Sequence, residues 1–304
     1  MRISGNLVSN SIIQNLNIDL ARLQELNQQT ATGKRINAPS DDPLGAQRVV
    51  NLNEALAGIV QYQRNAGYVT NYVSAAEGTL NGAVDVLRRA NGLAIRGAND
   101  ATLNQNELNA IADEINGILE QTVQAGNTRS EGKSLFAGYQ TTTDAFTVTR
   151  NAGGDITAVT YAGDNGVEQI EVDLGLTVNK NVTGAQVFQP AAGTDVFASL
   201  ITLRDDLRAG NAAGVSAGIA TTNAALDQVV DQVSALGNKT NLLQRATDNL
   251  ASKKLGLVAL DSQLADVDMP AAIVQLQTAQ NVYTAALQSS AKILQQPSLM
   301  DFLR

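Results

Sequence analysis

The sequence predicts a mainly α-helical protein: an elongated helical bundle or coiled coil formed by the N- and C-terminal segments, with a small β-rich insert domain in the middle. Apolar residues recur every three or four positions near both ends of the 304-residue chain, which is typical of helices with one narrow apolar face. Aromatic residues make up only 4% of the chain, and this composition suits long, thin helical packing. Alternating apolar and polar residues in the middle of the chain predict strands.

Each terminal segment predicts one helix. The first carries an apolar stripe at Ile13, Leu16, Leu20, Leu23, Asn27 and Thr30. The last is opened by Asp268 and Pro270 and closed by Pro297, with a stripe at Ile273, Leu276, Gln280, Tyr283, Leu287, Ser290 and Leu294. Because both stripes are narrow and interrupted by polar residues, neither helix is expected to hold its shape alone. The expected partners are the other terminal helix and neighbouring copies of the chain.

We therefore expect an assembly interface on the terminal helices and at the end of the chain, where further large apolar residues follow. Its expected members are Ile13, Leu16, Leu20, Leu23, Ile273, Leu276, Tyr283, Leu287, Leu294, Leu299, Phe302 and Leu303.

A boundary follows the first helix, where Asp42 is a candidate N-cap and Pro43 suits a first helical turn. The next helix carries the register Leu52, Leu56, Ile59, Gln63, Ala66, Thr70, Val73, Glu77, Leu80, Val84 and Leu87. After a turn near Asn99, a second stripe is expected to return antiparallel to it: Leu108, Ile111, Ile115, Ile118 and Thr122. Gly117 inside that stripe weakens the helix by about 1 kcal/mol relative to Ala.

Helical patterns resume at Asp195, with a short helix to about residue 209 and a long one over roughly residues 213–264. For the long central helices we expect an ordinary intramolecular core. Between the helical regions, residues 134–193 contain six acidic and two basic residues, hence a charge of -4 of the chain's -8. Phe146–Val148 and Thr157–Tyr161 predict a hairpin, and Ile170–Leu174 predicts a further strand. We expect this insert to be solvated.

Several classes of function are disfavoured by composition. The chain contains no Cys, His or Trp, so thiol chemistry, disulfides and histidine-based catalysis or metal binding are excluded. Its acidic balance argues against a nucleic-acid partner. The first twenty residues lack the apolar core of a secretory signal, and no window resembles a membrane span, so we expect any export to use another route and no membrane insertion.

No motif requires a cofactor or a metal. The segment Gly126–Ser134 resembles a phosphate-binding loop, but it is one residue too long and follows a predicted helix instead of a strand. The carboxylate pair Asp41/Asp42 and the pair Asp266/Asp268 precede helices and are interpreted as caps, while Asp205/Asp206 diverge on one helix. We therefore expect no catalytic residues.

The segment Thr32-Gly-Lys-Arg-Ile-Asn37, followed by Ala38-Pro-Ser-Asp-Asp-Pro43, closely resembles the N-terminal signature of the flagellin superfamily. Flagellins usually carry Ala at the place of Pro43, and the Ser-Asp-Asp-Pro variant is similar to the hook-filament junction branch of the superfamily. Met1–Ser4, Leu135–Gly138 and Ser298–Leu303 also resemble that branch. The matching signature residues are Gly33, Lys34, Arg35, Ile36, Asn37, Pro39, Ser40, Asp41, Asp42 and Pro43.

The resemblance implies a structural adapter of the bacterial flagellum, with no enzymatic activity, that joins hook to filament as a ring of copies. It implies residues 1–40 with 265–304 as an inner coiled coil, 41–133 with 194–264 as a helical rod, and 134–193 as an outer domain. It also implies export through the flagellar type III apparatus without a cleaved signal, and an export chaperone. A neighbouring hook-associated junction protein and flagellin or other filament-side subunits are further implied partners.

Two alternatives remain open at this stage. A minor or short filament flagellin would share the signature but polymerise indefinitely. A secreted effector enzyme on a helical scaffold is more distant, because it needs a catalytic group that no motif supplies.

Overall fold

A computed structural model of the chain describes residues 2–99 and 104–295, which form two compact units. The first unit comprises residues 1–58 and 253–304, and the second comprises residues 59–252. The described helices are α1 (Arg2–Thr32), α2 (Pro43–Ala98), α3 (Gln105–Gly126), α4 (Gly184–Phe188), α5 (Val196–Arg208), α6 (Ala212–Ala265) and α7 (Met269–Gln295). Each unit contains one part of α2 and one part of α6. The division into three domains stays a prediction.

The predicted helix boundaries are confirmed where capping residues signalled them. Helix α2 begins at Pro43, directly after the Asp42 carboxylate, which accepts a hydrogen bond from the N–H of Gly45 at 2.8 Å. Asp195 caps α5 by accepting from the N–H of Ala198. Asp268 accepts from the N–H of Ala271 at the start of α7.

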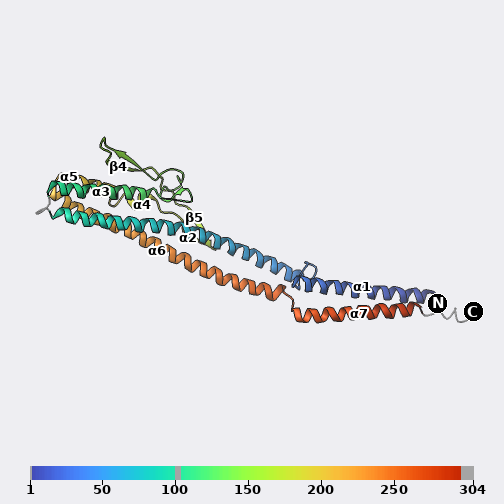
Figure 1. Cartoon of the computed structure of the whole chain (residues 1–304). Helices are drawn as coiled ribbons and strands as arrows, with labels where there is room; N and C mark the ends of the chain where they lie inside the picture. The colour runs from blue at the N-terminus through green and yellow to red at the C-terminus, as the bar shows by residue number, and fades with distance from the viewer. Residues whose placement is uncertain (1, 100–103, 296–304) are drawn as a thin grey trace, which may run out of the picture. The chain divides into compact units, whose positions relative to one another are not determined.

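In the first unit, α1 and α7 pack side by side, as Figure 1 shows in blue and red. Gly33 ends α1 in the left-handed conformation, with φ 70°, and its N–H donates to the carbonyl of Gln29 at 2.9 Å. The chain then turns through residues 34–42 into α2. Leu294 lies in α7, whereas Pro297, Leu299, Phe302 and Leu303 lie outside the described residues.

The second unit has its core between helices α2, α3, α5 and α6. The buried face of α2 follows a seam of alternating three- and four-residue steps: Ala66, Val69, Val73, Ala76, Leu80, Ala83, Leu87, Ala90 and Ala94. The register predicted for α2 shares Ala66, Val73, Leu80 and Leu87 with this column, and its members Ile59 and Val84 are also buried. Its polar members Thr70 and Glu77 are only half-buried. Several positions of this buried column are alanines, whose small side chains let neighbouring helices approach α2 closely.

Helix α3 is continuous across Asn116 and Gly117, and it buries the whole predicted stripe of Leu108, Ile111, Ile115, Ile118 and Thr122. Asn104 caps it, in a reciprocal capping box with Glu107. The Asn116 side chain also accepts a hydrogen bond from Arg204 Nη1 on α5 at 2.9 Å. This packing offsets the propensity cost of Gly117.

The strands form three two-stranded antiparallel sheets. They are β1 (Arg129–Ser130) with β2 (Lys133–Ser134), β3 (Phe146–Arg150) with β4 (Ile156–Tyr161), and β5 (Gln169–Asp173) with β6 (Leu176–Asn179). The predicted hairpin is confirmed as β3–β4, and the predicted third strand is β5. The prediction missed β1, β2, β6 and α4.

Most residues of the insert are exposed or half-buried, as expected, but its phenylalanines are not. Phe136, Phe146 and Phe188 are almost fully buried, and the ring of Phe188 makes edge-on contacts with the rings of Phe136 and Phe146. Phe197 of α5 joins this cluster, at 4.9 Å between its ring centroid and that of Phe146. The buried Phe residues of the insert therefore attach it to the helical core.

Candidate functional site

The paired terminal helices contact each other through one column of side chains on each helix. On α1 the column of buried or half-buried positions is Ile12, Leu16, Asp19, Leu23, Leu26 and Thr30. On α7 it is Ala272, Leu276, Ala279, Tyr283, Ala286 and Ser290. Both columns alternate steps of four and three, the spacing of a coiled-coil seam. We call these two columns the seam.

The residues predicted for an assembly interface divide between the seam and an exposed flank beside it. Leu16, Leu23, Leu276 and Tyr283 lie in the seam. Ile13, Leu20, Ile273 and Leu287 lie on the flank with 55, 36, 48 and 42% of their surface exposed. Ile18, Val274 and Val282 add further exposed apolar side chains to these helices.

The polar residues that were predicted to interrupt the two stripes also divide between seam positions and exposed positions. Ser290 and Thr30 are half-buried at seam positions, but Asn27 and Gln280 are exposed, so the prediction that these two amides interrupt the seam is wrong. The predicted stripes contained Asn27, Ile273 and Gln280, but the seam contains the preceding residues Leu26, Ala272 and Ala279. The seam therefore keeps polar members at Asp19, Thr30 and Ser290. Large apolar residues remain exposed outside it.

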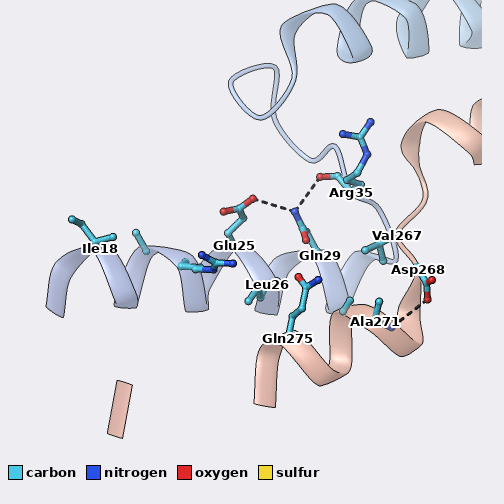
Figure 2. A pocket seen from close by; sticks show the side chains of 12 residues that line it. Ile18, Glu25, Leu26, Gln29, Arg35, Val267, Asp268, Ala271 and Gln275 are labelled. Carbon is cyan, nitrogen blue, oxygen red and sulfur yellow. Dashed lines mark hydrogen bonds between the residues drawn. The ribbon is translucent and has the colours of Figure 1, made fainter. Parts of the chain in front are cut away.

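A groove of about 680 Å³ runs between α1 and α7 next to the turn that follows α1. Figure 2 shows Leu26 and Gln275 directed toward it, and Gln29 between Glu25 and the backbone of Arg35. Gln29 Nε2 donates to Glu25 Oε1 at 3.2 Å and to the Arg35 carbonyl at 3.4 Å. A second cavity of about 250 Å³ shares Arg22 and Gln275 with the first. The helix pair thus offers a hollow surface lined by both apolar and charged side chains.

The turn after α1, which contains the predicted family signature, is held by its own side chains. Thr32 Oγ1 donates to Asn37 Oδ1 at 2.8 Å, and Asn37 Nδ2 donates to the Lys34 carbonyl at 2.8 Å. The Asp41 carboxylate accepts from the N–H groups of Ala38 and Asn37 at 2.8 and 3.0 Å, and these bonds lower the pKa of Asp41.

Other signature residues shape the entry into α2. Asp42 accepts from Gly45 N–H, which lowers the pKa of Asp42, and it also lies 3.4 Å from Arg35 Nη2. A Cβ added at Gly45 would lie 2.6 Å from Ile36 Cδ1, so Gly45 allows Ile36 to pack against the helix. Pro39, Ser40 and Pro43 are exposed. Pro39 and Ser40 lie in the turn, and Pro43 is the first residue of α2.

The same turn is bonded to the connection between α6 and α7. Lys34 Nζ lies 2.7 Å from Asp266 Oδ1 and 3.3 Å from Asp261 Oδ2. The hydrogen bond to Asp266 is the main cause that raises the pKa of Lys34, and the same bond lowers the pKa of Asp266. Within the described residues, Asp261 Oδ1 is buried without a hydrogen-bond partner, so Lys34 is the cation that offsets the charge of Asp261.

Backbone bonds accompany these ion pairs. The N–H of Arg35 donates to the Ala265 carbonyl at 2.6 Å, and the N–H of Val267 donates to the Gly33 carbonyl at 3.0 Å. Arg35 Nη2 donates to the Leu264 carbonyl at 2.8 Å. We call residues 33–35 with residues 261–267 the clasp. Sequence analysis missed it, because no local pattern connects two segments that lie so far apart in the chain.

The described residues were compared with the requirements of a metal site, a membrane-spanning helix and a phosphate-binding loop. Across residues 2–99 and 104–295, no three Asp or Glu side chains are grouped as a metal site, and none of the helices there is long and apolar enough to cross a membrane. The segment that resembles a phosphate-binding loop leaves the end of α3 and forms the short hairpin β1–β2, with φ 52° at Glu131. A strand, loop and helix, which a phosphate-binding loop requires, do not follow one another there.

Comparisons with known proteins identify relatives along the whole chain. Residues 3–141 match the family model of the bacterial flagellin N-terminal helical region. The chain is 28% identical to flagellar hook-associated protein 3 of Salmonella typhimurium, over 96% of this chain and 95% of that protein. It is 27% identical to flagellin of Bacillus subtilis, with both chains covered completely.

Among solved structures, flagellar hook-associated protein 3 of Legionella pneumophila matches with a TM-score of 0.63 at 17% identity, covering 71% of this chain and 98% of that chain. At that identity the likeness concerns the fold. The mainly helical fold with a small β-rich insert is confirmed, and so is the resemblance carried by the signature residues.

Proposed function

We propose that this chain, a protein of the flagellin superfamily related to flagellar hook-associated protein 3, is a structural adapter between the hook and the filament of a bacterial flagellum. The observation that carries the proposal is the exposed apolar flank of the terminal helices. Ile13, Ile273 and Leu287 remain open to solvent although α1 and α7 are already paired. A surface of this kind is stabilised when other subunits cover it.

The proposed mechanism is folding coupled to assembly. The seam holds α1 against α7, and the flank and groove are covered by neighbouring copies in a ring. A hook-associated junction protein on one side and flagellin or another filament-side subunit on the other are the proposed neighbours. The assembly residues in this proposal are the flank and seam positions named above, together with Leu294, Leu299, Phe302 and Leu303.

The proposal extends to export and location. The chain passes unfolded through the flagellar type III apparatus without a cleaved signal, and a cytoplasmic chaperone protects the apolar surface of α7 before export. Its place of action is the extracellular flagellum. The absence of cysteine is compatible with passage between reducing and oxidising spaces, since no disulfide can form on the way. The role is structural, without catalysis or cofactor.

Deletion of the gene in its own bacterium tests this function. Cells should carry hooks without attached filaments and should release flagellin into the medium, and the wild-type gene should restore the filaments. Filaments that are short but still attached would instead support a minor flagellin, an alternative favoured by the full-length similarity to flagellin of Bacillus subtilis. Retained filaments of normal length would contradict both functions.

The remaining alternative is a secreted effector enzyme on a helical scaffold. Substrate turnover or nucleotide binding by the purified chain, lost on Lys133→Ala, would support it.

A further inference from the structure

We propose that Asn165 is a site of spontaneous deamidation, where the side-chain amide is converted to a carboxylate without an enzyme. This inference goes beyond the proposed function, because it concerns a covalent change of the chain itself. The sequence contains four Asn-Gly pairs, all within the second unit: Asn81-Gly82, Asn91-Gly92, Asn116-Gly117 and Asn165-Gly166. The fold separates the last pair from the other three.

The reaction uses groups that every Asn-Gly pair supplies. Hydroxide takes the proton of the glycine N–H, and the backbone nitrogen then attacks the side-chain Cγ of the asparagine. The bond between Cγ and the amide nitrogen breaks, and ammonia leaves after taking a proton from water, which regenerates hydroxide. Water then opens the cyclic imide at either of its carbonyls and gives aspartate or isoaspartate. Glycine favours the attack, because no Cβ shields its nitrogen.

Ring closure requires a backbone that can rotate at the asparagine. The five-membered ring contains Cα, Cβ, Cγ and the carbonyl carbon of the asparagine together with the glycine nitrogen. Cβ and that nitrogen must therefore become nearly eclipsed about the Cα–C bond. An α-helix fixes this bond at ψ near −42°, which holds the two atoms apart, and it bonds the glycine N–H to the carbonyl four residues earlier.

Three of the pairs lie inside helices. The pairs at Asn81 and Asn91 belong to α2, and the pair at Asn116 belongs to α3. Two of these side chains are also bonded: Asn91 Nδ2 donates to Asn223 Oδ1, and Asn116 Oδ1 accepts from Arg204 Nη1, both at 2.9 Å. Asn81 is exposed on its helix, so it isolates the effect of the helical backbone. Reaction at any of the three requires local opening of a helix that contributes to the buried core.

Asn165 lies outside helices and strands, in the connection between β4 and β5. It is exposed, and neither its backbone nor its side chain makes a hydrogen bond within the part of the chain that the structure describes. The Gly166 N–H donates to Asp164 Oδ1 at 2.8 Å. Because the acceptor is a side chain of the same loop, loss of this bond opens no helix or strand. The peptide between Asn165 and Gly166 can then rotate toward ring closure.

The packing of Tyr139 requires glycine after Asn165. A Cβ added at Gly166 would clash with the Tyr139 ring, and the Tyr139 hydroxyl donates to the Val167 carbonyl at 2.9 Å. A larger residue, which would shield the backbone nitrogen and slow the reaction, does not fit at position 166. The contacts that order this loop therefore keep the susceptible pair.

Timed incubation of the purified full-length chain at mildly alkaline pH, followed by peptide mass spectrometry, measures conversion at each pair. We expect conversion at Asn165 to exceed conversion at Asn81 roughly tenfold or more, because only Asn81 requires opening of a core helix. Methylation by an isoaspartyl methyltransferase with S-adenosylmethionine detects the isoaspartate product independently. Asn165→Gln should remove most of this methylation, since glutamine would have to form a larger ring.

The same chain unfolded in guanidinium chloride is the matched control. All four pairs should then react at similar rates, because the fold no longer separates them. Three results would overturn the proposal: equal conversion of Asn165 and Asn81 in the folded chain, conversion of Asn165 only after unfolding, or methylation that is unchanged in Asn165→Gln. These measurements need neither hook nor filament, so their outcome is independent of the gene-deletion experiment.

Discussion

Arg208 Nη1 at the end of α5 lies 2.6 Å from Asp155 Oδ2, just before strand β4. Its other terminal nitrogen, Nη2, lies 2.9 Å from Asp113 of α3, so one guanidinium joins two helices to the β3–β4 hairpin. One turn earlier, Arg204 Nη1 donates to the Ile156 carbonyl at 2.8 Å. The acidic insert is thus held to the helical core by two basic residues of α5.

Asp155→Asn should loosen the β3–β4 hairpin without unfolding the second unit. Arg208 lowers the pKa of Asp155 through its hydrogen bonds, so the carboxylate stabilises the fold above the usual aspartate pKa of about 4, and this stabilisation is lost as pH falls through the lowered pKa. Hydrogen exchange in residues 156–161 should rise several-fold at neutral pH. The exposed Asp231→Asn serves as a control on α6 and should leave the hairpin unchanged.

Phe146→Ala should destabilise the second unit by about 3–5 kcal/mol, because it leaves a cavity among Phe188, Phe197 and Tyr161. Denaturant unfolding followed by circular dichroism measures the loss. Leu174→Ala removes a large apolar side chain that is 83% exposed, and it should change stability by no more than about 0.5 kcal/mol. Equal effects of the two substitutions would show that the aromatic cluster does not attach the insert.

Tyr161 should titrate late at alkaline pH. Burial raises the pKa of Tyr161 to about 12, and its hydroxyl donates to the carbonyls of Phe136 and Asp164 at 2.9 and 2.7 Å. Because the pKa of Tyr161 is raised in the folded state, the neutral phenol stabilises the fold. This stabilisation is complete below about pH 10, which is the tyrosine pKa in unfolded chains, and it is lost as the pH rises toward 12. Ultraviolet absorbance of tyrosinate should show one fewer late-titrating group in Tyr161→Phe.

Seam and flank substitutions should separate pairing from assembly. Leu26→Ala removes a seam side chain that is 6% exposed, and it should raise hydrogen exchange in α7 of the purified chain. The double variant Ile13→Ser and Ile273→Ser changes only exposed flank positions, so exchange in the free chain should stay close to the wild type. In cells, the flank variant should nevertheless release filaments into the medium. Attached filaments in that variant would exclude these positions from the interface.

Local signals predicted much of the secondary structure. Asp42 with Pro43, and Asp195, mark helix starts because capping is a matter of neighbouring backbone N–H groups. The alternation of apolar and polar residues around Phe146 and Tyr161 predicted the β3–β4 hairpin, because this pattern also depends only on residues close together in the chain. The signature at residues 32–43 identified the superfamily, and the chain's relatives agree with it.

The sequence by itself determined the order of the long helices around the β-rich insert, the mainly helical class and the position of the signature turn, since each depends on residues close together in the chain. The sequence predicted the buried face of α3, but only the tertiary structure decided which positions are buried on α1, α2 and α7. Ala76 of α2 and Ala272 of α7 are buried at positions that a count of large apolar residues overlooks, because a small side chain is buried when a neighbouring helix comes close to it. Pairing of Lys34 with Asp261 and Asp266 likewise required the fold, which brings the two ends of the chain together.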